Sequence, residues 1–323
     1  MLSGRYPVAI LAHGRLTPKA CDALADAIED AIKALQGLGM TAHNEGRLRK
    51  AVIHLRRVAA RGSYGTTQEE LHLTAQAIHL ANDIYAITRA LPSTPDAAIV
   101  RELAAILGGT LDGKSSDRRA YEAQSQLWFG TLLAHSGLHP AILDLKKRRP
   151  DFIVQVESVR LAMEVKRPGS LQAIDRAIKS AANQIDSVGI PGFVVLDVSD
   201  VLLEAQAAGA LAIGATSYRE GSRPVFDAIA THAHDYLARY VADRQRAADE
   251  GRGQGCRAIG IIVYARFCVW EGNAPAQLDF GLFVSGGALD TTAARLYEHQ
   301  TERMLGRLVY GLERLTGNPL QPL

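Results

Sequence analysis

Apolar residues recur every three or four positions through the first third of the chain, a period typical of amphipathic helices. The first helix is expected to begin at Thr17 and Pro18, because a threonine N-cap followed by proline in the first turn favours a helix start. Four helices are predicted in this part, at 17–36, 44–60, 66–89 and 96–107. We therefore expect an all-helical N-terminal domain over residues 1–110, bounded by the glycines that follow.

The middle of the chain changes to the alternating pattern of a β-strand. Residues 151–156 read DFIVQV and residues 159–166 read VRLAMEVK, with only Glu157 and Ser158 between them. Two such runs joined by two residues predict a β-hairpin. Beyond it, helix and strand patterns alternate, with a helix predicted at 170–185, a strand from 191, a long helix at 222–249, strands at 258–269 and 277–284, and a closing helix at 291–315.

The predicted hairpin brings acidic and basic side chains together. Strand side chains alternate between faces, so Glu164 and Lys166 point the same way. A two-residue turn sets Asp151 directly opposite Glu164, with Cβ atoms about 5 Å apart, where two bare carboxylates repel each other. A bridging cation would remove that repulsion. The plainer alternative is a solvated sheet edge, since antiparallel sheets often leave one face in water.

Composition bounds the remaining possibilities. The 323 residues are 47% hydrophobic, which supports a substantial core, and the net charge of +2 means that any site for a polyanion must be local. Cys21, Cys256 and Cys268 form no CxxC pair, which argues against a zinc ribbon or a disulfide framework and fits a reducing cytoplasm. No stretch of about twenty residues has the character of a membrane span. We expect a soluble, cytoplasmic protein.

The residues Pro150-Asp151 and Glu164-x-Lys166 resemble the motif of the PD-(D/E)XK nuclease superfamily. The resemblance covers roughly residues 113–200. It implies a restriction-endonuclease-like α/β core in which helices flank a central mixed β-sheet, with the order helix, strand, strand, strand, helix, strand. The corresponding domain would span residues 111–323, with the later strands and the closing helix as extensions. It also implies hydrolysis of DNA phosphodiester bonds with Mg²⁺, or alternatively Mn²⁺, as cofactor.

The resemblance also suggests roles for individual residues. Asp151 and Glu164 would bind the cation directly, because Mg²⁺ is usually held by one or two carboxylates with waters and substrate phosphate, and the carbonyl of Val165 is a plausible further ligand. Lys166 would orient the attacking water or stabilise charge in the transition state. Glu122, on the predicted helix before the hairpin, is a second-tier catalytic candidate.

Two groups of basic residues are candidates for nucleic-acid binding, because lysine and arginine on phosphates supply affinity without reading sequence. One group adjoins the acidic motif and comprises Lys146, Lys147, Arg148, Arg149 and Arg167. The other forms a stripe on the second predicted helix and comprises Lys50, Arg57 and Arg61. An ordinary solvated helix face explains this stripe at least as well.

Three functions are compatible with these patterns. The first is a Mg²⁺-dependent DNA nuclease whose N-terminal helices grip substrate, bind a partner protein or form a homodimer. The second is a nuclease-like scaffold that binds DNA or protein without cutting it, and the retention of Asp151, Glu164 and Lys166 speaks against that role. The third is an RNA nuclease, because the resemblance alone favours DNA over RNA.

Overall fold

The computed structural model describes residues 12–41, 46–92, 95–111, 118–138, 141–142, 149–207, 218–270 and 278–317. Its centre is a seven-stranded sheet with the order β1-β7-β6-β5-β4-β3-β2. The strands are β1 (Ala12–Leu16), β2 (Ala141–Ile142), β3 (Phe152–Val156), β4 (Val159–Lys166), β5 (Gly192–Asp197), β6 (Ala258–Trp270) and β7 (Leu278–Ala288). The sheet is mixed, because β4, β5 and β6 run parallel while the other neighbours are antiparallel.

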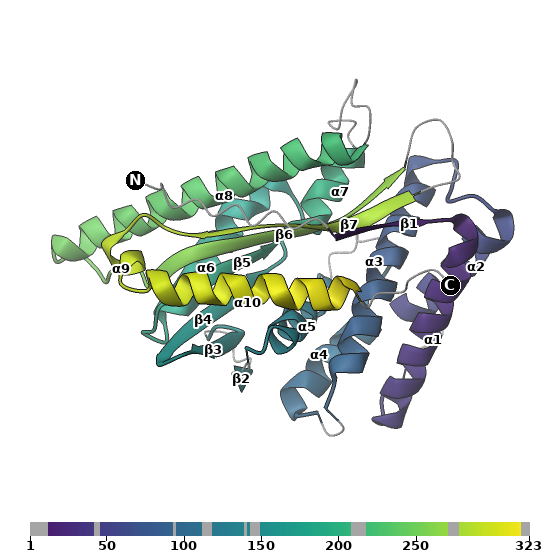
Figure 1. The fold of residues 1–323 in the computed structure, drawn as a ribbon, viewed down its shortest axis with the longest axis horizontal. Coiled ribbons are helices and arrows are strands. Elements are labelled where there is room, and N and C mark those ends of the chain that lie inside the picture. Colours follow the sequence, from purple (N-terminus) through teal and green to yellow (C-terminus); the bar gives the residue numbers. More distant parts are fainter. Residues whose placement is uncertain are drawn as a thin grey trace.

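Helices cover both faces of this sheet and gather beyond one end of it (Figure 1). They are α1 (Cys21–Gly37), α2 (Arg47–Arg61), α3 (Gln68–Ala90), α4 (Ala97–Leu107), α5 (Arg119–His135), α6 (Ile174–Asp186), α7 (Ser199–Ala207), α8 (Tyr218–Asp249), α9 (Thr292–Arg295) and α10 (Glu298–Gly317), with short 3₁₀ turns at Pro18–Ala20 and Leu171–Ala173. The predicted α/β class, with a mixed sheet between helices and a helical region before it, is therefore confirmed.

The two faces of the sheet are closed by different helices. Phe226 of α8 stacks on Phe283 of β7, with ring centroids 5.3 Å apart. On the other face, Gly286 of β7 lies close under Leu305 of α10. Figure 1 accordingly shows α8 and α10 running along opposite sides of the sheet. Strands covered on both faces can carry almost continuous apolar sequence, as β5 does with every residue buried.

The β3–β4 hairpin has the register that the sequence predicts. Val156 pairs with Val159, and Phe152 pairs with Met163. The turn consists of Glu157 and Ser158, and Glu157 adopts a left-handed backbone with φ of 55°. Extending the pairing by one residue sets Asp151 opposite Glu164, and the candidate site depends on this arrangement.

Local sequence signals also explain the helix starts. Thr67 forms a capping box with Glu70 at the start of α3, and the Asp96 side chain accepts hydrogen bonds from the first turn of α4. At the C-terminal end of α2, Gly62 caps the helix with φ of 68°, a conformation that glycine adopts without a steric penalty. These caps confirm the third and fourth predicted helices.

The expectation of an all-helical N-terminal domain is wrong in one respect. The segment Ala12–Leu16 forms β1 and pairs antiparallel with β7, so the chain adds a strand to the sheet before the first helix begins. The apolar core is also continuous, because residues of α1 to α4 and of the sheet belong to one buried cluster. β1 has five residues that mix apolar and polar types, and its partner strand β7 lies far away along the chain. A pattern this short does not predict a strand.

Within the ranges described above, none of the helices combines the length and the apolar character that a membrane crossing requires.

Candidate active site

The open end of the β3–β4 hairpin brings Asp151, Glu164 and Lys166 into one cluster. The main-chain N–H of Asp151 donates to Oε2 of Glu164 at 3.0 Å, and the N–H of Val165 donates to Oδ2 of Asp151 at 2.9 Å. The Nζ of Lys166 donates to Oε1 of Glu164. Each acid is therefore held by the main chain of the opposite strand, and the predicted convergence of the two carboxyl groups is what the hairpin produces. We call Asp151 and Glu164 the acid pair.

Burial dominates the electrostatics of the acid pair. Asp151 is 4% exposed and Glu164 is 0% exposed. Burial, followed by the neighbouring charge of Glu164, raises the pKa of Asp151 well above its usual range. Burial also raises the pKa of Glu164, although the ammonium of Lys166 opposes the shift. One ammonium thus faces two carboxyl groups, and the cluster lacks positive charge when both are ionised.

Lys166 is the most accessible member of the cluster. Its side chain is 26% exposed, whereas that of Glu164 is 0% exposed. Burial lowers the pKa of Lys166, but the charges of Glu164 and Asp151 outweigh burial, so the pKa is raised and the side chain stays protonated. A charged donor at the mouth of a buried acidic cluster can meet an anionic substrate before the acids do.

Two helices supply amide groups to the acid pair. From α5, Nε2 of Gln126 donates to Oδ1 of Asp151 at 2.8 Å. From α6, Gln184 hydrogen-bonds to Glu164 and also donates to the carbonyl of Arg149 at 3.3 Å. Gln126 was not among the residues predicted for this site. A signal existed, because Gln126 follows the candidate Glu122 by four residues and shares its helix face.

The position of Glu122 suits a secondary role. The residue is exposed on α5, and its charge is among those that raise the pKa of Lys166. It is therefore near enough to the cluster for its charge to act on Lys166. In the described structure the direct α5 contact to the acid pair comes from Gln126.

The donor set of the cluster fits a hard divalent cation. Carboxylate and carbonyl oxygens are the ligands that Mg²⁺ prefers, and the acid pair with the Val165 carbonyl offers them. No three His, Cys, Asp or Glu side chains of the described residues gather into a metal-binding group. A cation at this hairpin would therefore be held by two carboxylates and by oxygens of other kinds. The missing positive charge of the cluster is the observation that supports this fit.

The prediction that Arg167 contacts nucleic acid is wrong. Its side chain is 0% exposed and donates to both oxygens of Asp200, from Nε at 3.1 Å and from Nη2 at 2.7 Å. Burial lowers the pKa of Arg167, but Asp200 and Asp197 outweigh burial, so the guanidinium remains charged in the interior. Successive residues of an extended chain point in opposite directions, which separates Arg167 from Lys166.

Arg167 belongs to a buried set of ion pairs that we call the arginine–aspartate network. Arg266 of β6 pairs with Asp197 and with Asp83 of α3, and its Nε donates to Oγ of Ser199 at 3.1 Å. Arg118 donates to Asp200 at 2.6 Å. The members are Asp83, Arg118, Arg167, Asp197, Asp200 and Arg266. The network ties the N-terminal helices to the sheet.

The other basic residues predicted to bind nucleic acid differ in exposure and in ion pairing. Arg149 is exposed, directly before the hairpin, while Lys146, Lys147 and Arg148 lie outside the described residues. On α2, Lys50 and Arg57 are exposed. Arg61 on the same helix donates to Glu70 at 2.8 Å, so its charge is already matched by a partner.

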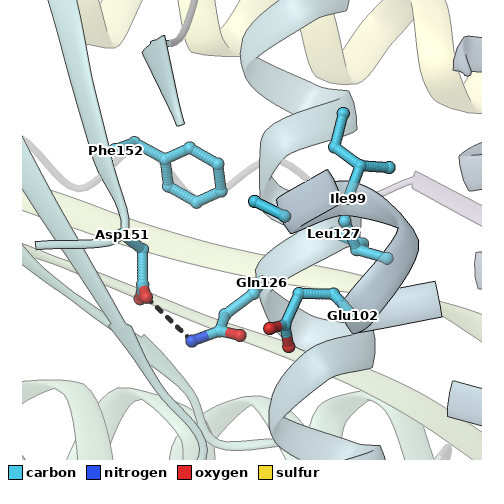
Figure 2. A pocket seen from close by; sticks show the side chains of 7 residues that line it. Ile99, Glu102, Gln126, Leu127, Asp151 and Phe152 are labelled. Atoms are coloured by element: carbon cyan, nitrogen blue, oxygen red, sulfur yellow. Dashed lines mark hydrogen bonds between the residues drawn. The ribbon is translucent and has the colours of Figure 1, made fainter. Parts of the chain in front are cut away.

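A small pocket opens beside the acid pair, between α4, α5 and the start of β3. Its lining includes Asp151, Gln126 and Glu102. Figure 2 shows the hydrogen bond between Gln126 and Asp151, with the Glu102 carboxyl group beside the amide. Glu102 is 2% exposed, and one of its oxygens pairs with Arg119. Glu102 was not predicted for this site, because nothing in the local sequence distinguishes it from other acids on a helix.

No protein-family model, curated protein or solved structure matches this chain.

Proposed function

We propose that this chain is a Mg²⁺-dependent nuclease of PD-(D/E)XK type that hydrolyses phosphodiester bonds of DNA. The observation that carries the proposal is the meeting of Asp151, Glu164 and Lys166 at the end of one hairpin, with a deficit of positive charge. A buried, strongly perturbed group of this kind is more typical of a functional site than of a solvated strand edge. The element order α5-β2-β3-β4-α6-β5 agrees with the order that the sequence resemblance implies.

The acid pair and the carbonyl of Val165 would hold the cation, which can be Mg²⁺ or Mn²⁺. When bound, the cation neutralises charge on the phosphoryl oxygens and lowers the pKa of a coordinated water. The protein fixes the two carboxylates beforehand through the main-chain hydrogen bonds of Asp151 and Val165. Gln126 further restricts the rotation of the Asp151 carboxylate. Such preorganisation removes the need to arrange the ligands during the reaction.

Lys166 would act on the scissile phosphate and on the attacking water. Its ammonium is protonated, partly exposed and anchored by Glu164, so it can donate hydrogen bonds to an anionic oxygen or hold a water in line with phosphorus. The charge of Glu122 favours the protonated state of this ammonium. Contacts with the DNA backbone would come from exposed basic residues such as Arg149, Lys50 and Arg57.

A cleavage assay with the full chain tests the proposal. Duplex DNA, single-stranded DNA and RNA are each incubated with Mg²⁺, with Mn²⁺ or with chelator, using wild type, Lys166→Met and Lys33→Met. Lys33 is a matched control, because it lies exposed on α1 and pairs only with Asp30 in the described structure. We expect DNA cleavage that needs the cation, a loss of at least about 100-fold in Lys166→Met, and no change in Lys33→Met.

Other results would redirect the proposal. Cleavage that persists in chelator or in Lys166→Met contradicts the assigned chemistry. Tight DNA binding by wild type without cleavage favours the scaffold, and cleavage of RNA alone favours an RNA nuclease.

A further inference from the structure

Arg47, the first residue of α2, is fully buried but lacks hydrogen-bond partners. The residue is 0% exposed, and in the described part of the chain its Nε, Nη1 and Nη2 all lack an acceptor. Its guanidinium carbon lies 3.9 Å from the centroid of the Tyr121 ring of α5. The face of an aromatic ring attracts the cation, but it provides no oxygen acceptor for the N–H groups. Buried donors of this kind are uncommon in native proteins and indicate a water, an ion or a ligand.

The charge of Arg47 is also unbalanced. Arg167 and Arg118 lie beside the same ring, with guanidinium carbons 4.9 and 5.8 Å from its centroid, and both are paired with Asp200. The arginine–aspartate network contains as many arginines as aspartates, so it has no negative charge in excess for Arg47. Burial lowers the pKa of Arg47 to about 10, which leaves the guanidinium charged at neutral pH. Among the described residues, one buried positive charge therefore remains without a counter-ion.

The start of α2 adds further positive charge at the same place. Its N-cap is Gly46, which provides no side chain for the first-turn N–H groups, and the first turn contains no acid. Arg47, Arg49 and Lys50 are instead within its first four residues. The N-terminus of a helix is the positive end of its dipole, so bases there are unfavourable and anions are stabilised. A sequence that contradicts a local rule in this way is typical of a functional site.

The available donors fit the oxygens of a phosphate group. A guanidinium donates two parallel hydrogen bonds to a phosphate or a carboxylate, and the N–H groups at a helix N-terminus commonly bind phosphate. Helical side chains lean toward the N-terminus, so the Arg47 guanidinium and the first-turn N–H groups of α2 lie at the same end. A phosphate dianion complements two sources of positive charge better than a carboxylate does. Arg118, whose side chain is 29% exposed, connects this cluster to solvent.

We propose that Arg47 and the N-terminus of α2 form a binding site for the phosphate group of a small molecule, beside the ring of Tyr121. Arg47 and Tyr121 are 0% and 1% exposed, so the site suits a small anion rather than the continuous backbone of DNA. The acid pair calls for a cation and this site for an anion, and the inference does not rest on the proposed nuclease activity. Arg167 and Tyr121 are nevertheless sequence neighbours of Lys166 and Glu122, so β4 and α5 contribute to both sites.

The test is anion binding by the full chain without nucleic acid or divalent cations. Sodium phosphate and adenosine monophosphate are compared with sodium chloride at equal ionic strength, by thermal melting and by calorimetry. We expect both phosphate compounds to raise the melting temperature of wild type at least about 2 °C above the chloride value, with one saturable site per chain. Tighter binding of the nucleotide would identify it as the ligand, and equal binding would assign recognition to the phosphate group alone; both results support the site.

Three variants separate ligand binding from a structural role. Arg47→Met keeps a long side chain without charge and should bind phosphate at least about 10-fold more weakly. In phosphate-free buffer it should melt no lower than wild type, because an unpaired buried charge is removed. Arg47→Lys keeps the charge without the planar guanidinium and should also bind more weakly. Arg239→Met, at an exposed position of α8, should bind as wild type does.

Several results would overturn the site. These are a wild type that responds to phosphate no more than to chloride, and unchanged affinity in Arg47→Met. A drop in the melting temperature of Arg47→Met without any phosphate effect in wild type would show that Arg47 serves only to pack on Tyr121. If Arg47→Met does not fold, unchanged affinity in Arg47→Lys decides against the site. Protection by an oligonucleotide without terminal phosphates, but not by inorganic phosphate, would assign Arg47 to the DNA backbone instead.

Discussion

The acid pair and the arginine–aspartate network are both buried, yet their charges are balanced in opposite ways. In the network, Asp200 lies between Arg167 and Arg118, and these guanidinium groups overcome burial and hold the pKa of Asp200 well below its usual range. Arginine charges also outweigh burial at Asp197, although burial still raises the pKa of Asp83. In the acid pair, burial prevails at both members and raises the pKa values of Asp151 and Glu164, and one ammonium faces two carboxyl groups. Both regions are buried, so the candidate site is distinguished by the incomplete compensation of its negative charge.

The largest effect is expected from breaking the network. Asp197→Ala would leave Arg266 and Arg167 short of a carboxylate in the interior. Removing one partner of a buried ion pair typically costs about 3–5 kcal/mol. Urea unfolding of the metal-free protein measures this loss. A loss below about 1 kcal/mol would mean that the network contributes little and that the comparison is unfounded.

Neutralising the acid pair should affect activity far more than stability. Glu164→Gln removes a proposed cation ligand, and we expect DNA cleavage to fall at least about 100-fold, equivalent to about 2.7 kcal/mol. Unfolding of the metal-free variant should differ from wild type by no more than about 1 kcal/mol, because a buried acid with a raised pKa gains little from ionisation. A large loss of stability with full cleavage would reverse the roles of the two regions.

The two regions should also respond oppositely to pH. The folded pKa values of Asp197 and Asp200 are lowered, so their contribution is present above the ordinary aspartate pKa of about 3.9 and is lost as pH falls below it. The folded pKa values of the acid pair are raised, so in metal-free buffer it disfavours folding increasingly as pH rises above about 4.

Two variants measured between pH 3 and pH 8 separate these effects. Relative to wild type, Asp200→Asn should lose most stability near neutral pH and least in acid. Asp151→Asn should gain stability relative to wild type as pH rises above about 4. Parallel curves for the two variants would contradict the comparison.

The smallest effect concerns the surface of α2. Arg57 is exposed, whereas Arg61 is paired with Glu70, so Arg57→Glu tests the predicted basic stripe more cleanly than a change at Arg61. We expect DNA binding at low salt to weaken a few-fold, with a reduced salt dependence, because one phosphate contact is lost. Arg239→Glu on α8 serves as an exposed control. Equal affinities in a fluorescence-anisotropy titration would assign the stripe to ordinary solvation.

Local sequence could predict the hairpin but not everything around it. The register of β3 and β4 follows from alternation and from a two-residue turn, so the convergence of Asp151, Glu164 and Lys166 was readable. By contrast, β1 pairs with a strand more than 260 residues later, and no local pattern encodes that partner. The short helix α7, which carries Asp200, was not predicted either.

The misassigned and missed residues share a cause. Arg167 was interpreted as a surface charge because it follows Lys166, and only the fold reveals its buried partner Asp200. Gln126 and Glu102 reach the pocket because α4 and α5 pack beside the hairpin. Such convergence depends on tertiary packing, which the spacing of residues along the chain does not determine.

The hairpin turn determines the strand register at the candidate site, which lies at the other end of the hairpin. Glu157 lies about 20 Å along the strand from Asp151, given a rise of about 3.4 Å per residue. Its carboxylate is paired with Arg303 of α10, which secures the loop from the last helix of the fold. Inserting one residue there would shift the β4 partner by one step and swing Glu164 to the opposite side. The length of this surface turn therefore determines whether Asp151 and Glu164 converge. An insertion in the turn would separate the two carboxyl groups without changing any residue of the pocket.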